Sequence, residues 1–289
     1  MALRKTIRSR RLGKQLREFR HQANLRQEDL VVVMNEGLNS EYRISGNHWR
    51  RAENGLSRLT PVHLARFCEV LEVEEEQAAA LERLRAKADE PGWWQEYSDV
   101  VPEAVEMLVE LGEDAAEIRT YDTVFIQGLL QTEAYTAAAA SSARAMVHPI
   151  DVDRVVELRM RRQERLFDPD FAGLLAVMTE GAIRTVVGGP KVMSTQLAHL
   201  LKIGQSEKVS IHVLPFTVTP PGCDSLVIFS FPHESDNEVV YVDSDTAQRI
   251  HEDREPVRQC TYTFDMALGQ ALSSSASQEL IRNVMRELQ

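Results

Sequence analysis

The stretch Ser45-Gly-Asn-His-Trp-Arg-Arg-Ala-Glu-Asn-Gly55 decides the fold of the N-terminal part of this chain. Ser45 is a good N-cap, because a serine hydroxyl can accept a hydrogen bond from the free amides of a helix's first turn. Trp49 and Ala52 are three residues apart and therefore share one side of the helix. Asn54 and Gly55 end it, since glycine readily adopts the left-handed conformation found at helix ends. The stretch predicts a short helix with one buried and one polar side.

Three more helices are expected around this one. The first carries a stripe of apolar residues at helical spacing before Asn24: Leu12, Leu16, Phe19 and Ala23. The second begins within Leu25–Leu30, and three of its residues are expected to face the core: Leu30, Val33 and Met34. The fourth begins at Thr60-Pro61, because proline is favoured at the first helical position. Its buried stripe is Leu64, Phe67 and Leu71.

Charge is distributed unevenly along the 289 residues, which have a net charge of −11. Residues 1–67 contain 14 basic and 6 acidic residues, a net charge of +8. Residues 69–117 contain 16 acidic and 3 basic residues, and their simplest interpretation is solvated helix faces. The N-terminal part, here called the head, is basic, and the rest of the chain, here called the body, is acidic. This distribution is typical of a phosphate-binding module attached to a domain with another task.

The polar side of the third helix has the chemistry of DNA recognition. Asparagine can form two hydrogen bonds with adenine, and arginine two with guanine. A glycine lets the backbone approach the sugar-phosphate edge, and Gln27 is placed to bond a phosphate beside helix-terminal amides. The alternative is a small helical bundle whose polar surface binds no ligand. The candidate DNA-binding residues are Gln27, Ser45, Gly46, Asn47, His48, Arg50 and Arg51.

The head resembles the Cro/repressor-type (XRE) helix-turn-helix family in three segments: Leu12-Gly-Lys-Gln-Leu-Arg17, Arg26-Gln-Glu-Asp-Leu30 and Arg51-Ala-Glu-Asn-Gly55. The resemblance implies an all-α helix-turn-helix domain over residues 1–72 that binds double-stranded DNA. One departure is the connection from Met34 to Ser45, which exceeds the usual turn of about three or four residues. Either an extra loop protrudes there, or a short added turn near Ser40–Arg43 joins the motif.

Residues 73–115 are predicted to form an acidic helical linker. Glu72–Lys87 is helical by composition, and Pro91-Gly92 breaks the helix. Trp93 and Trp94 follow, and paired tryptophans most often pack between domains. Contact with a partner protein is the alternative, because tryptophan is enriched in the residues that dominate binding interfaces.

Residues 116–289 are predicted to form an α+β domain with a mixed sheet. The expected strands are Ile118–Ile126, Phe171–Thr179, Val209–Pro215, Ser225–Phe231 and Glu238–Asp243. One helix is expected to begin near Thr132, and four more are expected over Val152–Leu166, Val192–Ile203, Pro256–Leu272 and Gln278–Leu288. The helix Val152–Leu166 contains five arginines, which form a solvated face, pair with the acidic body or bind an acidic partner: Arg154, Arg159, Arg161, Arg162 and Arg165. Trp93, Trp94, Arg159 and Arg162 are the candidate partner-binding residues.

The body resembles the C-terminal domain of WhiJ-like, antitoxin-like actinobacterial regulators. The matching segments are Gly128-Leu-Leu-Gln-Thr-Glu-Ala-Tyr135, Arg159-Met-Arg-Arg-Gln-Glu-Arg-Leu166, Val187-Gly-Gly-Pro190, Gln196-Leu-Ala-His-Leu200, Val213-Leu-Pro-Phe216 and Val239-Val-Tyr241. Ala134 and Thr136 depart from the pattern. The resemblance implies a transcription regulator, often a repressor, that acts with a small regulatory partner protein.

No sequence motif supports catalysis, a cofactor or a metal site. Val186-Val-Gly-Gly-Pro190 lacks the lysine and hydroxyl of a phosphate loop, and no HExxH or HxxxH spacing occurs. No run is long and apolar enough for a membrane span, and three distant cysteines fit buried thiols in a cytoplasmic, nucleoid-associated protein. We expect a homodimeric regulator and not an enzyme. The alternatives are a regulator that senses a small molecule and an enzyme with a DNA-binding head.

Overall fold

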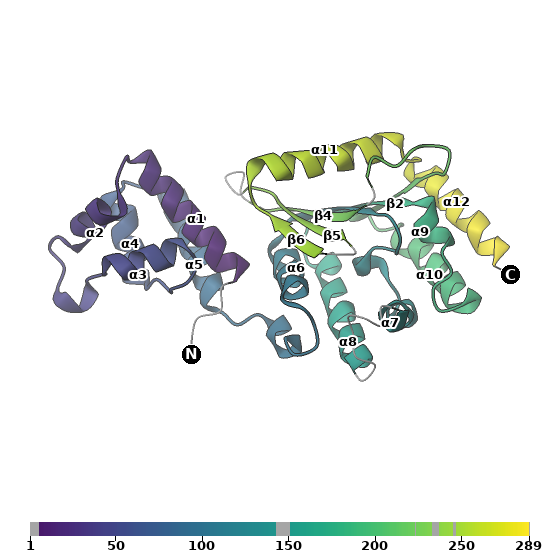
Figure 1. Ribbon diagram of the computed structural model, residues 1–289, viewed down its shortest axis with the longest axis horizontal. Coiled ribbons are helices and arrows are strands. Elements are labelled where there is room, and N and C mark those ends of the chain that lie inside the picture. The colour runs from purple at the N-terminus through teal and green to yellow at the C-terminus, as the bar shows by residue number, and fades with distance from the viewer. Residues whose placement is uncertain (1–5, 143–150, 223, 233–236, 245–246, 289) are drawn as a thin grey trace. The chain divides into compact units, whose positions relative to one another are not determined.

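The computed structural model describes residues 6–142, 151–222, 224–232, 237–244 and 247–288. The chain divides into two compact units, residues 1–93 and 94–289. The first is all helical, and the second is built on a six-stranded sheet (Figure 1). The predicted fold class, an all-α domain followed by an α+β domain with a mixed sheet, is therefore confirmed. The division lies within residues 73–115, so that this segment contributes one helix to each unit.

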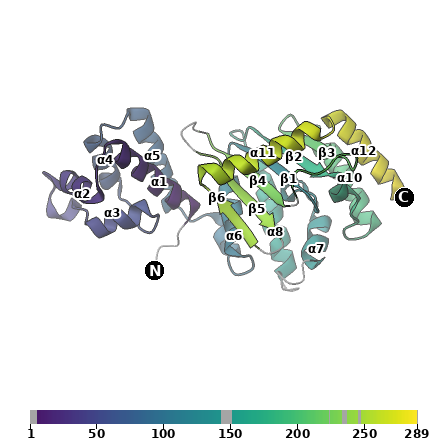
Figure 2. The same cartoon turned by 45° about the horizontal axis from the view of Figure 1, so that its top comes forward.

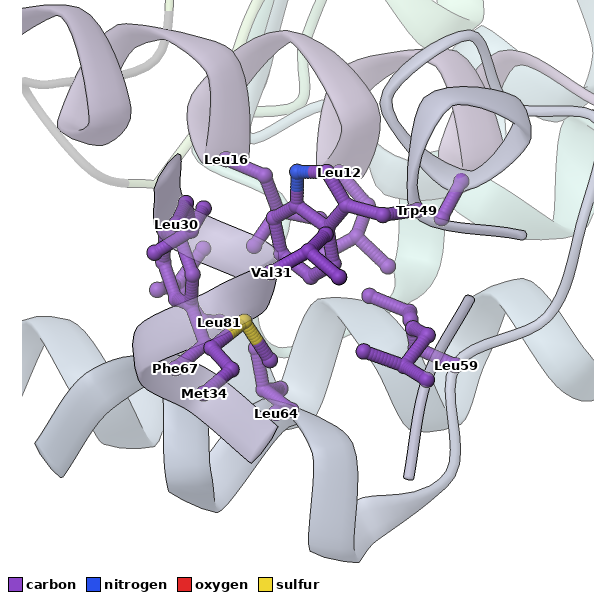
Figure 3. Close-up of a cluster of buried hydrophobic side chains, with 12 residues drawn as sticks. Leu12, Leu16, Leu30, Val31, Met34, Trp49, Leu59, Leu64, Phe67 and Leu81 are labelled. Carbon is purple, nitrogen blue, oxygen red and sulfur yellow. The ribbon is translucent and has the colours of Figure 1, made fainter. Parts of the chain in front are cut away.

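The first unit contains α1 (Ile7–Gln22), α2 (Gln27–Asn35), η1 (Ser40–Tyr42), α3 (Gly46–Glu53), α4 (Pro61–Val70) and α5 (Glu75–Asp89). Ser45 caps α3 by accepting from the His48 amide, and Thr60 caps α4 in the same way. Trp49 stacks on Phe67 at 5.2 Å in the centre of the core, and the aliphatic side chains of the other helices surround this pair (Figure 3). Leu81 of α5 belongs to the same core and is 1% exposed.

Helices α1 and α3 approach closely because glycines line their contact. A Cβ added at Gly13 would lie 2.5 Å from the carbonyl oxygen of Glu53. Gly55, directly after α3, has a φ of +68°, and a Cβ there would lie 2.9 Å from the backbone of Ser9. These contacts are with backbone atoms, which cannot move aside as a flexible side chain can. The spacing of α1 and α3 therefore requires both glycines.

The long connection between α2 and α3 is closed by one asparagine. The Asn35 amide donates to the Ile44 carbonyl and accepts from the Ile44 amide, each at 2.9 Å. Arg66 of α4 donates to carbonyls at the end of α2, including that of Met34. Between these fixed ends, η1 forms at Ser40–Tyr42. The second alternative from the sequence, a short added turn near Ser40–Arg43, is what the structure shows.

The second unit has one mixed sheet with the strand order β3-β2-β1-β4-β5-β6. Strands β3, β2 and β1 pair in parallel, and the other neighbouring strands pair in antiparallel. The strands are β1 (Glu117–Asp122), β2 (Gly173–Thr179), β3 (Val209–Leu214), β4 (Ser225–Ser230), β5 (Val239–Ser244) and β6 (Ala247–His251). The strand predicted for Ile118–Ile126 ends at Asp122, since the next backbone amide, that of Thr123, donates to the Ser225 hydroxyl. The edge strand β6 was not predicted.

Helices cover both faces of this sheet (Figures 1 and 2). One face packs on α11 (Arg254–Gln270), with Tyr121, Val177, Ile228 and Val240 against Phe264. The opposite face is covered by α6 (Glu103–Asp114), α7 (Glu133–Ser142), α8 (Val152–Gln163) and α10 (Pro190–Ile203). The remaining elements are η2 (Trp93–Tyr97), η3 (Gly128–Leu130), η5 (Glu164–Phe167), α9 (Glu180–Arg184) and α12 (Ser274–Glu287). Since neighbouring residues of a strand alternate between faces, Thr120 and Asp122 face away from α11.

Replacing Gly13 by alanine is expected to destabilise the first unit. Alanine favours helix by about 1 kcal/mol, but overpacking against a fixed backbone typically costs about 1–3 kcal/mol, so the net effect is a loss. Amide hydrogen exchange of α1 and α3 in the full-length protein should therefore become faster. Gly46→Ala is the control, because a Cβ there meets nothing within 4 Å. Unchanged exchange in Gly13→Ala would show that the close approach is not rigid.

Candidate nucleic-acid interface

The orientation of α3 is set by a buried carboxylate at its end. Glu53 is 2% exposed, and its Oε1 accepts from Arg20 Nε and Trp49 Nε1, each at 2.7 Å. Its Oε2 accepts from Arg20 Nη2 at 2.9 Å and from Gln27 Nε2 at 2.6 Å. These donors come from α1, α2 and α3 itself. One carboxylate thus joins three helices and holds the outer side of α3 in place.

The hydrogen bonds to Glu53 outweigh the cost of its burial. Burial alone would raise the pKa of Glu53, whereas donation from Arg20, Gln27 and Trp49 lowers it, and the net pKa lies below the usual value. The carboxylate is therefore ionised at neutral pH. A buried ion pair with this many hydrogen bonds is strongly destabilised when one partner is removed.

The outer side of α3 presents Gly46, Asn47, Arg50 and Arg51 to solvent, as the sequence predicted. Arg50 donates to Asn47 Oδ1 at 3.0 Å, and Arg51 donates to the Leu56 carbonyl at 2.9 Å. Within the described ranges, neither arginine forms an ion pair with a carboxylate. Both guanidinium charges are therefore available to phosphate or to base edges.

The other three predicted DNA-binding residues have partners within the fold. The Ser45 hydroxyl caps α3, although the residue is exposed. His48 lies with Nε2 2.7 Å from the Arg58 carbonyl oxygen and its ring edge-to-face with that of His63. Gln27 is partly buried, and its amide nitrogen donates to Glu53. A phosphate contact by Gln27 would therefore use its backbone amide, at the start of a helix without a side-chain cap.

Two exposed residues near α3 were not selected from the sequence. Asn54 lies directly after the helix, donates to the Arg50 carbonyl and accepts from Arg17. Arg43 is exposed two residues before the N-cap, and no ion pair involves it among the described residues. Only sequence position could have identified Asn54 as a candidate, because it follows Arg50 by four residues and so lies on the same side of the helix.

The predicted partner-binding residues do not form one exposed surface. Trp94 is 5% exposed, and Trp93 is partly buried. Arg159 and Arg162 are partly buried in α8, and Arg159 Nη1 donates to Gln131 Oε1 at 2.7 Å. Burial of Trp94 agrees with the packing interpretation of the tryptophan pair. These four residues therefore offer a partner protein little accessible side-chain surface.

A serine–histidine pair on β3 is accounted for by packing. Ser210 Oγ lies 3.0 Å from His212 Nε2, and His212 Nδ1 lies 2.9 Å from the Leu272 carbonyl. A backbone carbonyl takes the place where a catalytic triad has a carboxylate. The Leu272 amide also donates to the Val213 carbonyl at 2.9 Å. The pair ties β3 to the connection between α11 and α12.

Other site chemistry is sparse in the described part of the chain. No group of three or more His, Cys, Asp or Glu side chains there could hold a metal ion. Cys68 and Cys260 are partly buried free thiols whose pKa values burial raises, while Cys223 lies outside the described residues. None of the helices described has the length and apolar character that a membrane crossing requires.

Comparison with known families agrees with this division of the chain. Residues 11–81 match the model of a helix-turn-helix domain, so the first unit has the fold of a DNA-binding regulator. Residues 105–283 match the model of a domain of unknown function, DUF5753, and this match covers more than half of the chain. The chain therefore belongs to the DUF5753 family. No curated protein and no solved structure matches it significantly. The resemblance to WhiJ-like regulators stays a prediction.

Glu53→Gln is expected to lower the free energy of unfolding of the first unit by about 3 kcal/mol at pH 7, because Arg20 loses its buried counter-charge. The folded-state pKa of Glu53 is depressed, so its stabilisation is complete above the unfolded pKa of about 4.3 and is lost as pH falls through the folded value. Urea unfolding of both proteins at pH 7 and pH 3 measures this difference.

Asp29→Asn is the control, since it removes a carboxylate from an exposed pair with Arg26. Its unfolding midpoint should match that of the wild type. A destabilisation by Glu53→Gln that is as large at pH 3 as at pH 7 would contradict the electrostatic explanation.

Proposed function

We propose that this protein is a sequence-specific transcription regulator that acts as a repressor when its first unit occupies DNA. The observation that carries the proposal is the side of α3 with Asn47, Arg50 and Arg51 exposed and free of carboxylate partners. In a helix-turn-helix domain, this side enters the major groove. Asparagine and arginine there can read adenine and guanine, and a further arginine can contact phosphate.

The first unit supports this role through its charge and its helix ends. Residues 1–67 carry a net charge of +8, which attracts the DNA backbone. The uncapped start of α2 offers backbone amides to a phosphate. The two hydrogen bonds between the Asn35 side chain and the Ile44 backbone fix the start of α3 independently of the longer turn before it. The longer turn is thus compatible with insertion of α3.

Binding as a homodimer is part of the proposal. A single small head buries little surface, and helix-turn-helix proteins usually read two half-sites about 34–36 Å apart. Most large apolar residues of the head pack in its own core, and the exposed ones, Val32, Tyr42, Leu56 and Val62, lie on separate elements, so we assign the dimer contact to the second unit. Its α11 helix carries two large exposed apolar residues one turn apart, Tyr262 and Met266.

We assign a regulatory, non-enzymatic role to the second unit. A small partner protein is the signal that the resemblance to WhiJ-like regulators implies. The burial of Trp94 and the partly buried positions of Arg159 and Arg162 favour a small molecule instead. An exposed protein-binding surface would need such residues to be accessible, whereas a ligand site can lie between a helix and the sheet.

Substitutions in α3 should separate base reading from phosphate binding. Asn47→Ala is expected to cost about 1–3 kcal/mol on the preferred duplex and little on unrelated DNA. Arg51→Gln should weaken binding to both duplexes and reduce the slope of log affinity against log salt by about 1. The measurement is fluorescence anisotropy with a duplex selected from random DNA. Arg286→Gln, a charge-matched change in α12, is the control. Unchanged affinities for both α3 variants would refute the assignment.

The oligomeric state provides a separate prediction. Light scattering of the full-length protein at micromolar concentration should give twice the mass of the chain, which is 32.7 kDa. Met266→Glu places a charge on the exposed side of α11 and should shift the protein toward monomer. Asn283→Glu, which places the same charge at an exposed position of another helix, α12, serves as the comparison. A monomer both free and on DNA would exclude the dimer.

A further inference from the structure

Two arginines of α8 lack the acidic partners that the other arginines of this segment have. Arg154 pairs with Asp99 at 2.6 Å, and Arg161 pairs with Glu96. Arg165, which follows in η5, pairs with Asp168 at 2.9 Å and Asp170 at 2.7 Å. By contrast, Arg159 and Arg162 form no ion pair with a carboxylate in the described part of the chain.

Both unpaired arginines are on the side of the sheet that faces away from α11. They are three residues apart and therefore share one side of α8. Val240 and Val242 pack in the α11 core, so the residues next to them in β5, Tyr241 and Asp243, face the opposite way.

The β1–β4–β5 register extends this polar surface across the sheet. Thr120 is opposite Val227, and Val227 is opposite Tyr241, so Thr120 and Tyr241 lie in one row about 10 Å apart. Asp122 is two residues further along β1 on the same face. The arginine pair and these strand residues therefore belong to one layer between α8 and the sheet.

The site carries positive charge where burial disfavours it. The pKa of Arg162 is lowered to about 10, mainly by burial and also by the neighbouring Arg159, while Tyr241 and Glu113 act in the opposite direction. Burial also lowers the pKa of Arg159, against the effect of Asp243 and the two nearby tyrosines. Both guanidiniums nevertheless remain charged at neutral pH. Two positive charges that are close together and partly buried destabilise the fold unless a group of opposite charge binds to them.

Arg159 is held in place by a neutral network. Its partner Gln131 is 3% exposed and also accepts from the Thr136 hydroxyl at 3.1 Å. The Gln131 side-chain nitrogen donates to the Ile126 carbonyl at 2.6 Å, and its backbone carbonyl accepts from Gln163 at 2.7 Å. The network orients a guanidinium without neutralising it.

The strand side of the site contains unsatisfied polar atoms. Thr120 is fully buried, and neither its hydroxyl nor Asp122 Oδ2 has a hydrogen-bond partner among the described residues. The pKa of Asp122 is raised to about 7, mainly by burial and also by Asp243, while the nearby Thr120 hydroxyl lowers it. Burial also raises the pKa of Tyr241, which remains a hydroxyl donor. The sheet side of the layer thus offers the hydroxyl groups of Tyr241 and Thr120 to a ligand, beside the carboxyl group of Asp122.

We propose that Arg159 and Arg162 bind the carboxylate or phosphate group of a small molecule, with Tyr241 and Thr120 as further contacts. This proposal rests on the regulatory role proposed above for the second unit. A guanidinium matches the two oxygens of a carboxylate or phosphate, and such an anion offsets the repulsion between the two arginines. Gln131 positions Arg159, so it acts through that arginine and not on the ligand.

The test is thermal unfolding of the full-length protein with inorganic phosphate or succinate, at constant ionic strength. The variants are Arg159→Gln, Arg162→Gln and Arg162→Lys, and Arg161→Gln is the control with the same charge change at the adjacent position. At least one anion should raise the melting temperature of the wild type and of Arg161→Gln by several degrees. The response to phosphate or to succinate tells which group the site prefers.

Arg159→Gln and Arg162→Gln should lose this response. Without ligand, Arg162→Gln should melt about 2–4 °C above the wild type, because the buried repulsion is relieved. Arg162→Lys keeps the charge but not the fork of donors, so it should retain part of the response and provides a readout if Arg162→Gln does not fold. No anion response in the wild type, or an equal response in all five proteins, would overturn the proposal. DNA affinity of the same proteins reports on the first unit separately.

Discussion

The first unit depends on the ion pair between Glu53 and Arg20. Its two atoms lie 2.7 Å apart in the core, where a carboxylate without partners would be strongly unfavourable. Gln27 and Trp49 donate to the same carboxylate, so the end of α3 is tied to α1 and α2 together. The residues proposed to contact DNA, Asn47, Arg50 and Arg51, precede Glu53 on the same helix. Their placement is therefore a consequence of a contact on the opposite, buried side.

The same constraint explains why the unit tolerates a longer turn. The position of α3 is determined at its end by Glu53 and at its start by the bonds between Asn35 and Ile44. Residues between Asn35 and Ile44 are not needed to transmit that position. Loop-closure entropy rises only slowly with length, so several added residues cost little once both ends are held.

Local signals made much of this fold predictable from sequence. The caps of α3 and α4, the proline at Pro61 and the apolar residues Leu12, Leu16 and Phe19 of α1 all act within a few residues, and the structure contains them. Ala23, predicted to continue the stripe of α1, is exposed, because the helix ends at Gln22. The strand β6 escaped prediction because it is an edge strand with a weak apolar pattern. The partners of Gln27 were also hidden, since Glu53 is 26 positions away. Contacts across such distances depend on the fold, which single-sequence patterns do not contain.

The arginines near α8 show how one sequence pattern can hold two physical roles. A solvated face, ion pairing with the acidic body and binding of an acidic partner were all compatible with the composition. The structure assigns the second role to Arg154, Arg161 and Arg165, because each meets a carboxylate. Arg159 and Arg162 sit among them on the same chain segment but meet none. The second unit is rich in acidic residues, and three of the five arginines form ion pairs with them. Arg159 and Arg162 therefore depart from the pairing of opposite charges that the rest of this segment follows. Real proteins break such rules mainly at functional sites, and this is why we propose a binding role for these two arginines and not for the other three.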